Sequence, residues 1–216
     1  MEHTIRVVQL KKELGGQVIL DGVNMEFRSG HTYGFMGRNG SGKTVFLKCI
    51  CGFMPATEGI ISLDGKILKK DMEYMEKMGF LIEHPGFLES CTAYDNLKYI
   101  ASIRRIAGDK EIRESILRLG LDPDSRKKVK HYSLGMKQRL GVAQAIMENP
   151  DILILDEPMN GLDDAGVAFM RELLNELKGQ GKIILIASHY KEDIEFLCDE
   201  IYNCKKGKFL LSEKES

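Results

Sequence analysis

The chain has 216 residues, of which 43% are hydrophobic and 29% charged, an ordinary composition for a globular protein with one large domain and a proper core. Its net charge of −1 argues against a general attraction to nucleic acid or anionic lipid, and its longest apolar runs are too short to span a bilayer. The first residues lack the basic-then-apolar order of a signal peptide. We therefore expect any membrane role to come through a partner.

The first third of the chain is predicted to be mainly β-structure. Short apolar runs predict strands over residues 4–10, 18–27, 32–36, 59–63 and 79–82, the second of them broken near Asp21. A helix is expected over residues 45–50, after a glycine-rich loop. Asp71 is expected to cap a short helix whose methionines, at positions 72, 75 and 78, face the core.

From residue 90 to about residue 147 the pattern becomes helical. Three amphipathic helices are expected there, the first capped by Thr92 and the third by Ser133. Strands and helices then alternate, with strands over 152–155 and 182–187, helices over 166–177 and 191–198, and two final strands over 201–204 and 208–211. Wholly apolar strands that alternate with helices predict an α/β fold with a parallel sheet.

Residues 37–44, G-R-N-G-S-G-K-T, match the phosphate-loop pattern G-x-x-x-x-G-K-[ST] between an expected strand and an expected helix. The glycines allow backbone N–H groups to approach phosphate oxygens at the positive end of the helix dipole. Lys43 supplies a cation for the β- and γ-phosphates, and Thr44 offers a hydroxyl to Mg²⁺. A chance glycine-rich turn is the alternative, but the correct spacing of three glycines with Lys-Thr argues against it. The predicted nucleotide-binding residues are Gly37, Arg38, Asn39, Gly40, Ser41, Gly42, Lys43 and Thr44.

The strand over residues 152–155 ends in two carboxylates. It delivers Asp156 to the carboxyl edge of the sheet, where ligands bind in open α/β folds and where an aspartate can hold Mg²⁺. Glu157 can orient and deprotonate a water for in-line attack on the γ-phosphate. An acidic pair at a surface turn is the alternative, and the phosphate loop in the same chain makes the catalytic interpretation preferable.

In order and spacing, these motifs resemble those of the ATP-binding cassette (ABC) ATPases over nearly the whole chain. The segments that carry the resemblance are the phosphate loop, Y-S-L-G-M-K-Q-R at 132–139, D-E-P at 156–158, N-G-L-D at 160–163 and S-H at 188–189. The segment from Ser133 resembles the signature L-S-G-G-Q, which essentially no other phosphate-loop class contains.

The resemblance implies a fold and a domain organisation. The fold is an α/β phosphate-loop NTPase of ABC type, with a central, mostly parallel sheet, an antiparallel β subdomain and an α-helical subdomain. A single ABC ATPase domain is expected over residues 1–216, with the helical signature subdomain at about 89–144 inserted in a RecA-like core.

The resemblance also implies site residues and partners. Two copies are expected to face each other head to tail as a homodimer, each binding ATP and Mg²⁺. The residues expected to reach the ATP of the opposite copy are Ser133, Leu134, Gly135, Met136 and Asp163. The expected catalytic residues are Glu157, His189, which resembles the switch histidine that contacts the γ-phosphate, and Lys43. The expected metal-site residues are Thr44, Asp156 and Glu83.

Three positions depart from the family pattern. Leu14 stands where an aromatic side chain usually stacks on adenine, Leu134 and Met136 replace a glycine and a glutamine of the signature, and Glu83 replaces a glutamine that senses Mg²⁺ and water. The segments I-E-H-P-G-F at 82–87 and S-L-G-M-K-Q-R-L at 133–140 resemble the branch that exports bacitracin, lantibiotics and similar antimicrobial compounds.

These observations predict the ATPase subunit of an ABC exporter, held at the cytoplasmic face of the membrane through separate membrane-spanning permease subunits. One alternative is a soluble ABC ATPase that acts on ribosomes or nucleic acid, but such proteins usually carry two cassettes or a coiled-coil insertion, and no nucleic-acid partner is expected here. A phosphate-loop kinase or GTPase is the other alternative. It lacks support because the guanine-reading N-K-x-D pattern is missing and the segment from Ser133 would have no role.

Overall fold

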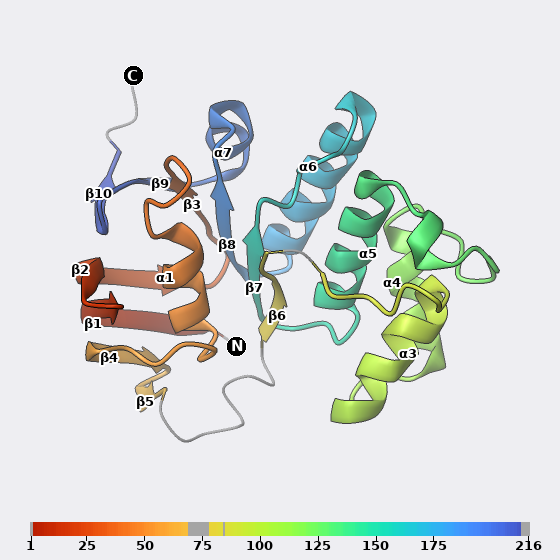
Figure 1. Cartoon of the computed structure of the whole chain (residues 1–216), viewed down its shortest axis with the longest axis horizontal. Coiled ribbons are helices and arrows are strands. Elements are labelled where there is room, and N and C mark those ends of the chain that lie inside the picture. The colour runs from red at the N-terminus through yellow and green to blue at the C-terminus, as the bar shows by residue number, and fades with distance from the viewer. Residues whose placement is uncertain (1, 69–77, 84, 213–216) are drawn as a thin grey trace.

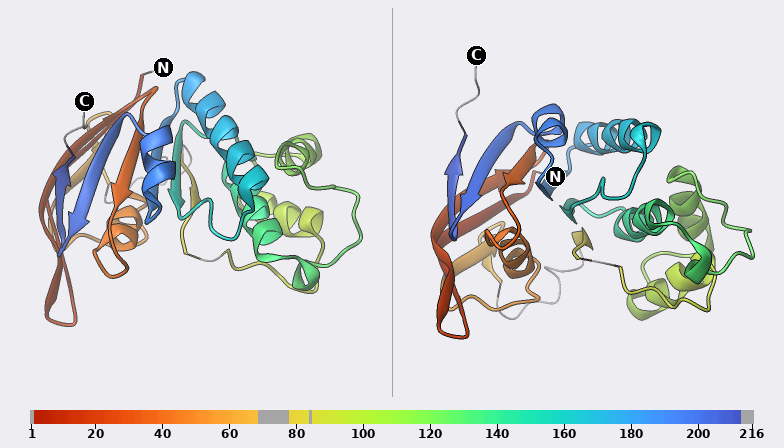
Figure 2. Two further views of the ribbon diagram at one scale, coloured as in Figure 1. Left: turned by 90° about the horizontal axis from the view of Figure 1, so that it is seen from above. Right: turned by 45° about the horizontal axis from the view of Figure 1, so that its top comes forward.

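Two sheets form the framework of the computed structural model, which describes residues 2–68, 78–83 and 85–212 (Figure 1). The antiparallel sheet has the order β2-β1-β4-β5 and consists of β1 (Thr4–Leu14), β2 (Gln17–Arg28), β4 (Glu58–Leu63) and β5 (Lys66–Ile67). Figure 2 shows the β1–β2 hairpin extending past the body of the protein. Gly15 and Gly16, both with positive φ, form its tip, a conformation that glycine adopts without steric cost.

The second sheet has six strands in the order β10-β9-β3-β8-β7-β6, all parallel except the β9–β10 hairpin. Its strands are β3 (Thr32–Met36), β6 (Met78–Leu81), β7 (Ile152–Asp156), β8 (Ile183–Ser188), β9 (Glu200–Lys205) and β10 (Lys208–Leu211). The order requires crossovers, and the longest, between β6 and β7, contains three of the α-helices. The predicted α/β fold with a mostly parallel sheet is therefore present.

Both faces of the parallel sheet are covered, which explains its wholly apolar strands. Along β7, Ile152 and Ile154 pack into the core shared with β1, β2 and α1 (Lys43–Ile50), while Leu153 and Leu155 pack into the core on the opposite face. The second core also contains side chains from α6 (Asp164–Gly179) and α7 (Lys191–Leu197). Successive residues of a strand point to opposite faces, so a strand buried on both sides is apolar at every position.

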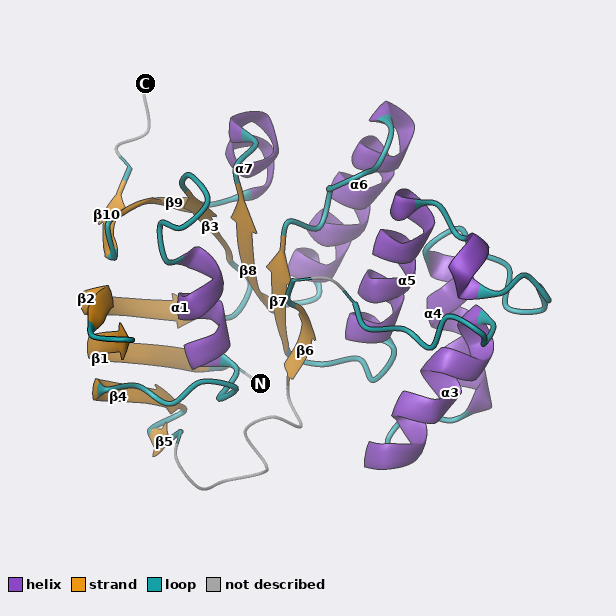
Figure 3. Cartoon of the chain, in the orientation of Figure 1, coloured by secondary structure: helices purple, strands orange, loops and turns teal. Residues whose placement is uncertain are grey.

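The remaining helices gather beyond β6 and β7 on the side away from the antiparallel sheet (Figure 3). They are α3 (Ala93–Arg104), α4 (Asp109–Arg118), the short 3₁₀ helix η1 (Val129–His131) and α5 (Leu134–Ile146). The predicted caps are confirmed, since the Thr92 and Ser133 hydroxyls accept hydrogen bonds from the Asp95 and Met136 amides. No helix among the described residues combines the length and the apolar character needed to cross a membrane.

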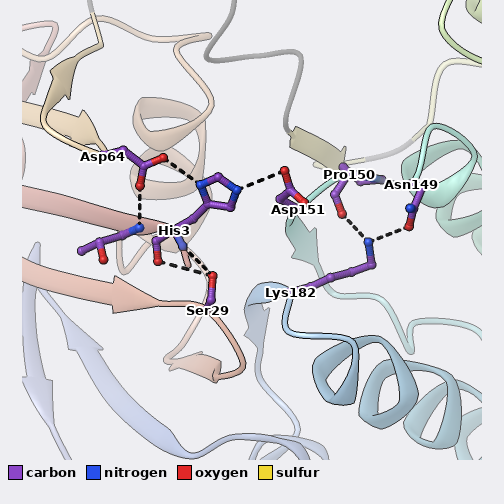
Figure 4. A network of polar contacts seen from close by, with 8 residues as sticks. His3, Ser29, Asp64, Asn149, Pro150, Asp151 and Lys182 are labelled. Atoms are coloured by element: carbon purple, nitrogen blue, oxygen red, sulfur yellow. Dashed lines mark hydrogen bonds and ion pairs between the residues drawn. The ribbon is translucent and has the colours of Figure 1, made fainter. Parts of the chain in front are cut away.

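A buried polar network joins the two sheets near the start of the chain (Figure 4). The buried ring of His3 places Nδ1 2.7 Å from Asp64 Oδ2 and Nε2 3.2 Å from Asp151 Oδ2. Asp64 follows β4 and Asp151 precedes β7, so the histidine links the antiparallel sheet to the parallel one. The Lys182 ammonium donates to Asn149 Oδ1 at 2.8 Å and fixes the entry to β8 against the same loop.

The predicted secondary structure differs from the observed one at Met78 and near Asp21. Met78 was expected on a helix, but it is the first residue of β6 and is buried in the sheet core. The rest of that expected helix, with Asp71, lies outside the described residues. The expected break at Asp21 is a bulge within one continuous strand, because Leu10 pairs with Val23 whereas Lys12 pairs with Leu20.

Candidate functional site

The glycine-rich loop lies between β3 and α1 as predicted. Gly42 immediately precedes the helix with φ of 105°, a conformation that strains other residues. At the start of the loop, a Cβ on Gly37 would lie 2.5 Å from the carbonyl oxygen of Cys204, so the loop packs directly against β9. The buried Lys43 ammonium donates to the Gly37 carbonyl at 2.6 Å, which places it under the loop.

Asp156 ends β7 directly opposite Thr44. The Thr44 hydroxyl donates to Asp156 Oδ2 at 2.7 Å, joining the first turn of α1 to the carboxyl edge of the sheet. Burial raises the pKa of Asp156, and the hydrogen bond from Thr44 opposes that rise. A hydroxyl and a carboxylate are oxygen donors of the kind that Mg²⁺ prefers, so this pair fits the predicted metal site.

Glu157 is held by contacts with β8, with α5 and with the residue after β8. Its φ of 52° is left-handed, and its amide donates to the Ala187 carbonyl of β8 at 2.8 Å. The Gln138 side chain of α5 donates to the Glu157 carbonyl at 2.8 Å. The carboxylate Oε2 accepts a hydrogen bond from the Ser188 hydroxyl at 3.3 Å and lies 2.9 Å from His189 Nδ1. Left-handed backbone at a non-glycine residue persists only where its surroundings hold it.

These groups line one cavity of about 790 Å³. Its walls consist of Ile19, Asn39, Gly40, Ser41, Gly42, Lys43, Thr44, Val45, Glu83, Asp156, Glu157, Asn160 and His189. Six of the eight predicted phosphate-loop residues are present, together with every predicted catalytic and metal-site residue. Gly37 and Arg38 belong to the loop but lie outside this wall. The described part of the chain contains no cluster of three or more His, Cys, Asp or Glu suited to a metal.

The sequence model of the ABC transporter family matches residues 20–160, which is well over half of the chain and runs from within β2 to Asn160. This chain belongs to the ABC transporter ATP-binding family. The family assignment confirms the predicted ABC ATPase, and the cavity just described is where the family's phosphate-loop motif lies in this cassette.

Relatives of similar sequence include several transport proteins. The uncharacterized ABC transporter ATP-binding protein YybJ of Bacillus subtilis is 44% identical over 210 residues, covering 97% of this chain and 96% of YybJ. The lantibiotic transport ATP-binding protein SrtF of Streptococcus pyogenes is 36% identical, covering 98% of this chain and 90% of SrtF. The bacitracin transport ATP-binding protein BcrA of Enterococcus faecalis is 38% identical, covering 93% of this chain and 66% of BcrA.

Solved structures agree with the cassette fold. An ATP-binding subunit of an ABC transporter superposes with a TM-score of 0.87 at 26% identity, covering 98% of this chain and 90% of that one. The dimeric bacterial ABC transporter cassette MJ0796 gives 0.86 at 25% identity, covering 95% and 96% of the two chains. CbiO1 of Clostridium perfringens, described as part of the transporter complex cbiONQ, gives 0.82 at 26% identity, covering 98% and 88%.

The signature segment and residues 161–163 of the N-G-L-D segment lie next to each other but outside the wall of the cavity, whereas Asn160 is part of that wall. A Cβ on Gly135 would lie 2.7 Å from the Gly161 carbonyl oxygen, so the start of α5 packs on the loop before α6. Ser133 and Leu134 are exposed, and Met136 is partly buried. Asp163 caps α6 by accepting from the Gly166 amide at 2.9 Å, and four-fifths of its side chain is exposed. These predicted residues therefore form a surface distinct from the wall of their own phosphate site.

Several residues of the site were not among the predicted site residues, although Asn160 and Gln138 lie in segments that carry the family resemblance. Ile19, on β2, and Asn160 line the cavity, and Gln138 supports Glu157 from within the signature helix. Lys48 lies 2.6 Å from the Glu83 carboxylate. Leu14, where the family pattern has an aromatic residue, ends β1 and is not part of this wall. Lys48 follows Thr44 by four residues on an expected helix, and this spacing is the sequence signal that could have placed Lys48 near the site.

Proposed function

We propose that this cassette hydrolyses ATP with Mg²⁺ and that its turnover powers the export of an antimicrobial peptide or antibiotic through separate membrane-spanning subunits. The observation that carries the proposal is that Lys43, Thr44, Asp156, Glu157 and His189 line one cavity, although they come from three different segments of the chain. The names of BcrA and SrtF support the substrate class, and that of cbiO1 supports work within a membrane complex.

In the proposed reaction each residue has one task. The loop amides and the Lys43 ammonium bind the phosphates and offset their charge. Glu157 accepts the proton of a water whose oxygen attacks the γ-phosphorus, while the bond to the bridging oxygen of ADP breaks. His189, which lies against Glu157, contacts the γ-phosphate. Thr44 and Asp156, with Glu83 beside them, would hold Mg²⁺, which neutralises charge on the β- and γ-phosphates when bound.

The proposed working unit is a homodimer with two composite sites. The exposed start of α5 supplies Ser133, Leu134, Gly135 and Met136 to the ATP of the opposite copy, and Asp163 follows from the adjoining loop. A serine at a helix N-terminus is a suitable anion site. The helical subdomain, about residues 89–144, would carry the contact surface for the permease. Such contacts would hold the cassette peripherally at the cytoplasmic face of the membrane.

Replacement of the proposed general base tests the reaction. We expect Glu157→Gln to lower ATP turnover by about 100-fold or more, since general base catalysis contributes about 10²–10⁴-fold, while ATP affinity stays within about threefold. Steady-state phosphate release and calorimetric titration measure the two quantities. Glu172→Gln, at an exposed position of α6, is the matched control. Retained turnover in Glu157→Gln would remove Glu157 from this role.

Co-purification separates the transporter assignment from an ABC ATPase that acts on ribosomes or nucleic acid. A tagged chain, expressed in its own cells and extracted in detergent, is expected to retain an integral membrane protein and no RNA or DNA. Mass spectrometry and nuclease-sensitive absorbance report the two outcomes. Retention of ribosomal proteins or nucleic acid in place of a membrane protein would contradict the transporter proposal.

A further inference from the structure

An ion pair joins the wall of the cavity to a lysine behind it that the motifs do not include. Lys48 Nζ lies 2.6 Å from Glu83 Oε1 and bridges α1 to the second residue after β6. Lys48 follows Thr44 by four residues, so both side chains lie on the same face of α1. Three-quarters of the Lys48 side chain is buried, although the Glu83 side chain is more exposed.

The backbone of Glu83 lies near the Asp156 carboxyl at the end of β7. Its φ of 59° is left-handed, as at Glu157, and its main chain acts to lower the pKa of the Asp156 carboxyl. Glu83 therefore contacts Asp156 through its main chain and Lys48 through its side chain. One residue at the end of an edge strand is thus tied both to the carboxyl edge of β7 and to the helix that presents Thr44.

The charges of the wall explain why a lysine is needed there. Among the described residues of the chain, those that line the cavity include three carboxylates, Glu83, Asp156 and Glu157, but a single lysine, Lys43. A triphosphate that enters this cavity meets net negative charge at neutral pH unless a neighbouring cation offsets it. Glutamine at position 83, the residue of the family pattern, would add no charge, whereas glutamate adds one. Lys48 supplies the compensating charge within contact distance.

We propose that Lys48 is a positioning residue for Glu83, which holds its carboxylate against α1 and neutralises it so that nucleotide binds beside it. The inference rests on the proposed function of the cavity. In this arrangement Lys48 acts through Glu83 and does not touch the nucleotide. The effect of Lys48 on ATP affinity therefore depends on the carboxylate at position 83. The effect is present with Glu83 and absent with glutamine at the same position.

A cycle of variants tests this dependence. Isothermal titration calorimetry with ATP in EDTA, and again with Mg²⁺, gives nucleotide affinity for the wild type, Lys48→Gln, Glu83→Gln and the double variant. We expect Lys48→Gln to weaken ATP binding in EDTA by about twofold to fivefold, the upper part of the range for a single partly exposed charge pair. We expect Lys48→Gln to have no further effect when Glu83 is already Gln, and we expect Lys48→Arg to bind as the wild type does.

Lys110→Gln removes the same charge from an exposed position on α4 and is the control. The proposal is overturned if Lys48→Gln leaves ATP affinity unchanged, or if it weakens binding equally with Glu83 and with Gln at position 83. Thermal unfolding of each variant shows whether a loss of ATP affinity comes from a loss of stability. If Lys48→Gln lowers ATP affinity equally with Glu and with Gln at position 83, the loss does not depend on the Glu83 carboxylate. If the wild type itself binds no ATP, the proposed function fails first, and the two failures remain distinguishable.

Discussion

At the scale of single residues, Asp199 shows how one carboxylate fixes a strand. Its Oδ2 accepts a hydrogen bond from the Thr32 amide at 2.8 Å, its own amide donates to the Thr32 carbonyl at 2.8 Å, and Oδ1 accepts from the Lys178 ammonium at 2.6 Å. Burial acts to raise the pKa of Asp199, but the contacts with Lys178 and Thr32 outweigh it, and the pKa lies below its ordinary value. The charged form is therefore the one that the fold stabilises.

Asp199→Asn should lower the free energy of unfolding at neutral pH by about 1–2 kcal/mol, because the charge-assisted hydrogen bond to Lys178 is lost. A depressed folded-state pKa contributes stability above the unfolded value of about 4, and this contribution is lost as the pH falls through the folded value. The gap between wild type and variant should therefore close in acid.

Urea unfolding at several pH values measures that gap. Asp124→Asn breaks an exposed ion pair with Arg113 and should change the free energy by less than about 1 kcal/mol. A gap for Asp199→Asn that stays constant down to about pH 3 would show that the carboxylate charge is not what matters.

The sequence predicts the residues that motifs define and misses those that only the fold brings together. The phosphate loop, Asp156 and Glu157 were predicted because their spacing along the chain carries the chemistry. Lys48 and Glu83 are separated by 35 positions, and the Gln138 contact with Glu157 also joins different elements. Such contacts depend on how β6 and α5 pack, which no local pattern specifies.

At the scale of elements, the contact between β6 and α5 sets how the helical region meets the sheet. A Cβ on Gly79 would lie 1.8 Å from the Ala145 carbonyl oxygen, far inside any permitted contact. The backbones of strand and helix therefore approach each other at a position that only glycine allows.

Gly79→Ala should separate β6 from α5 and lower the free energy of unfolding by about 2–3 kcal/mol or more, the cost of an overpacked core. Gly179→Ala, at the end of α6 where nothing lies within 4 Å, should be neutral or stabilising by up to about 1 kcal/mol. Chemical unfolding measures the stability of both variants. If Gly79→Ala fails to accumulate as folded protein while Gly179→Ala does, that result also supports the close contact between β6 and α5. Unchanged stability of Gly79→Ala would contradict it.

Element prediction succeeded where the hydrophobic period was unambiguous. The expected β3 residues 32–36 match the strand, and the run over 152–155 becomes β7 with one further residue, because buried parallel strands are apolar throughout. Met78 was misassigned because a three-residue spacing of methionines outweighed the short β6 that begins there. The two-residue β5 and the single turn of η1 were not predicted, since neither is long enough to show a period.

At the scale of the whole molecule, the predicted site residues of the cassette lie on two separate surfaces. The cavity contains the phosphate loop, Asp156 and Glu157, whereas the start of α5 and Asp163 form an exposed surface outside it. The central claim is that two copies bring one such surface to the other across bound ATP. ATP then acts as part of the interface, and dimerisation depends on nucleotide, as binding linkage requires.

Light scattering of the Glu157→Gln variant with ATP and Mg²⁺ tests this claim most directly. We expect twice the monomer mass when ATP is present, the monomer mass when it is omitted, and the monomer mass again when Ser133→Arg is added. The control change Ser102→Arg, at an exposed serine of α3, should leave the dimer intact. A mass that does not respond to ATP, or an ATP-dependent dimer that survives Ser133→Arg, would contradict the composite site.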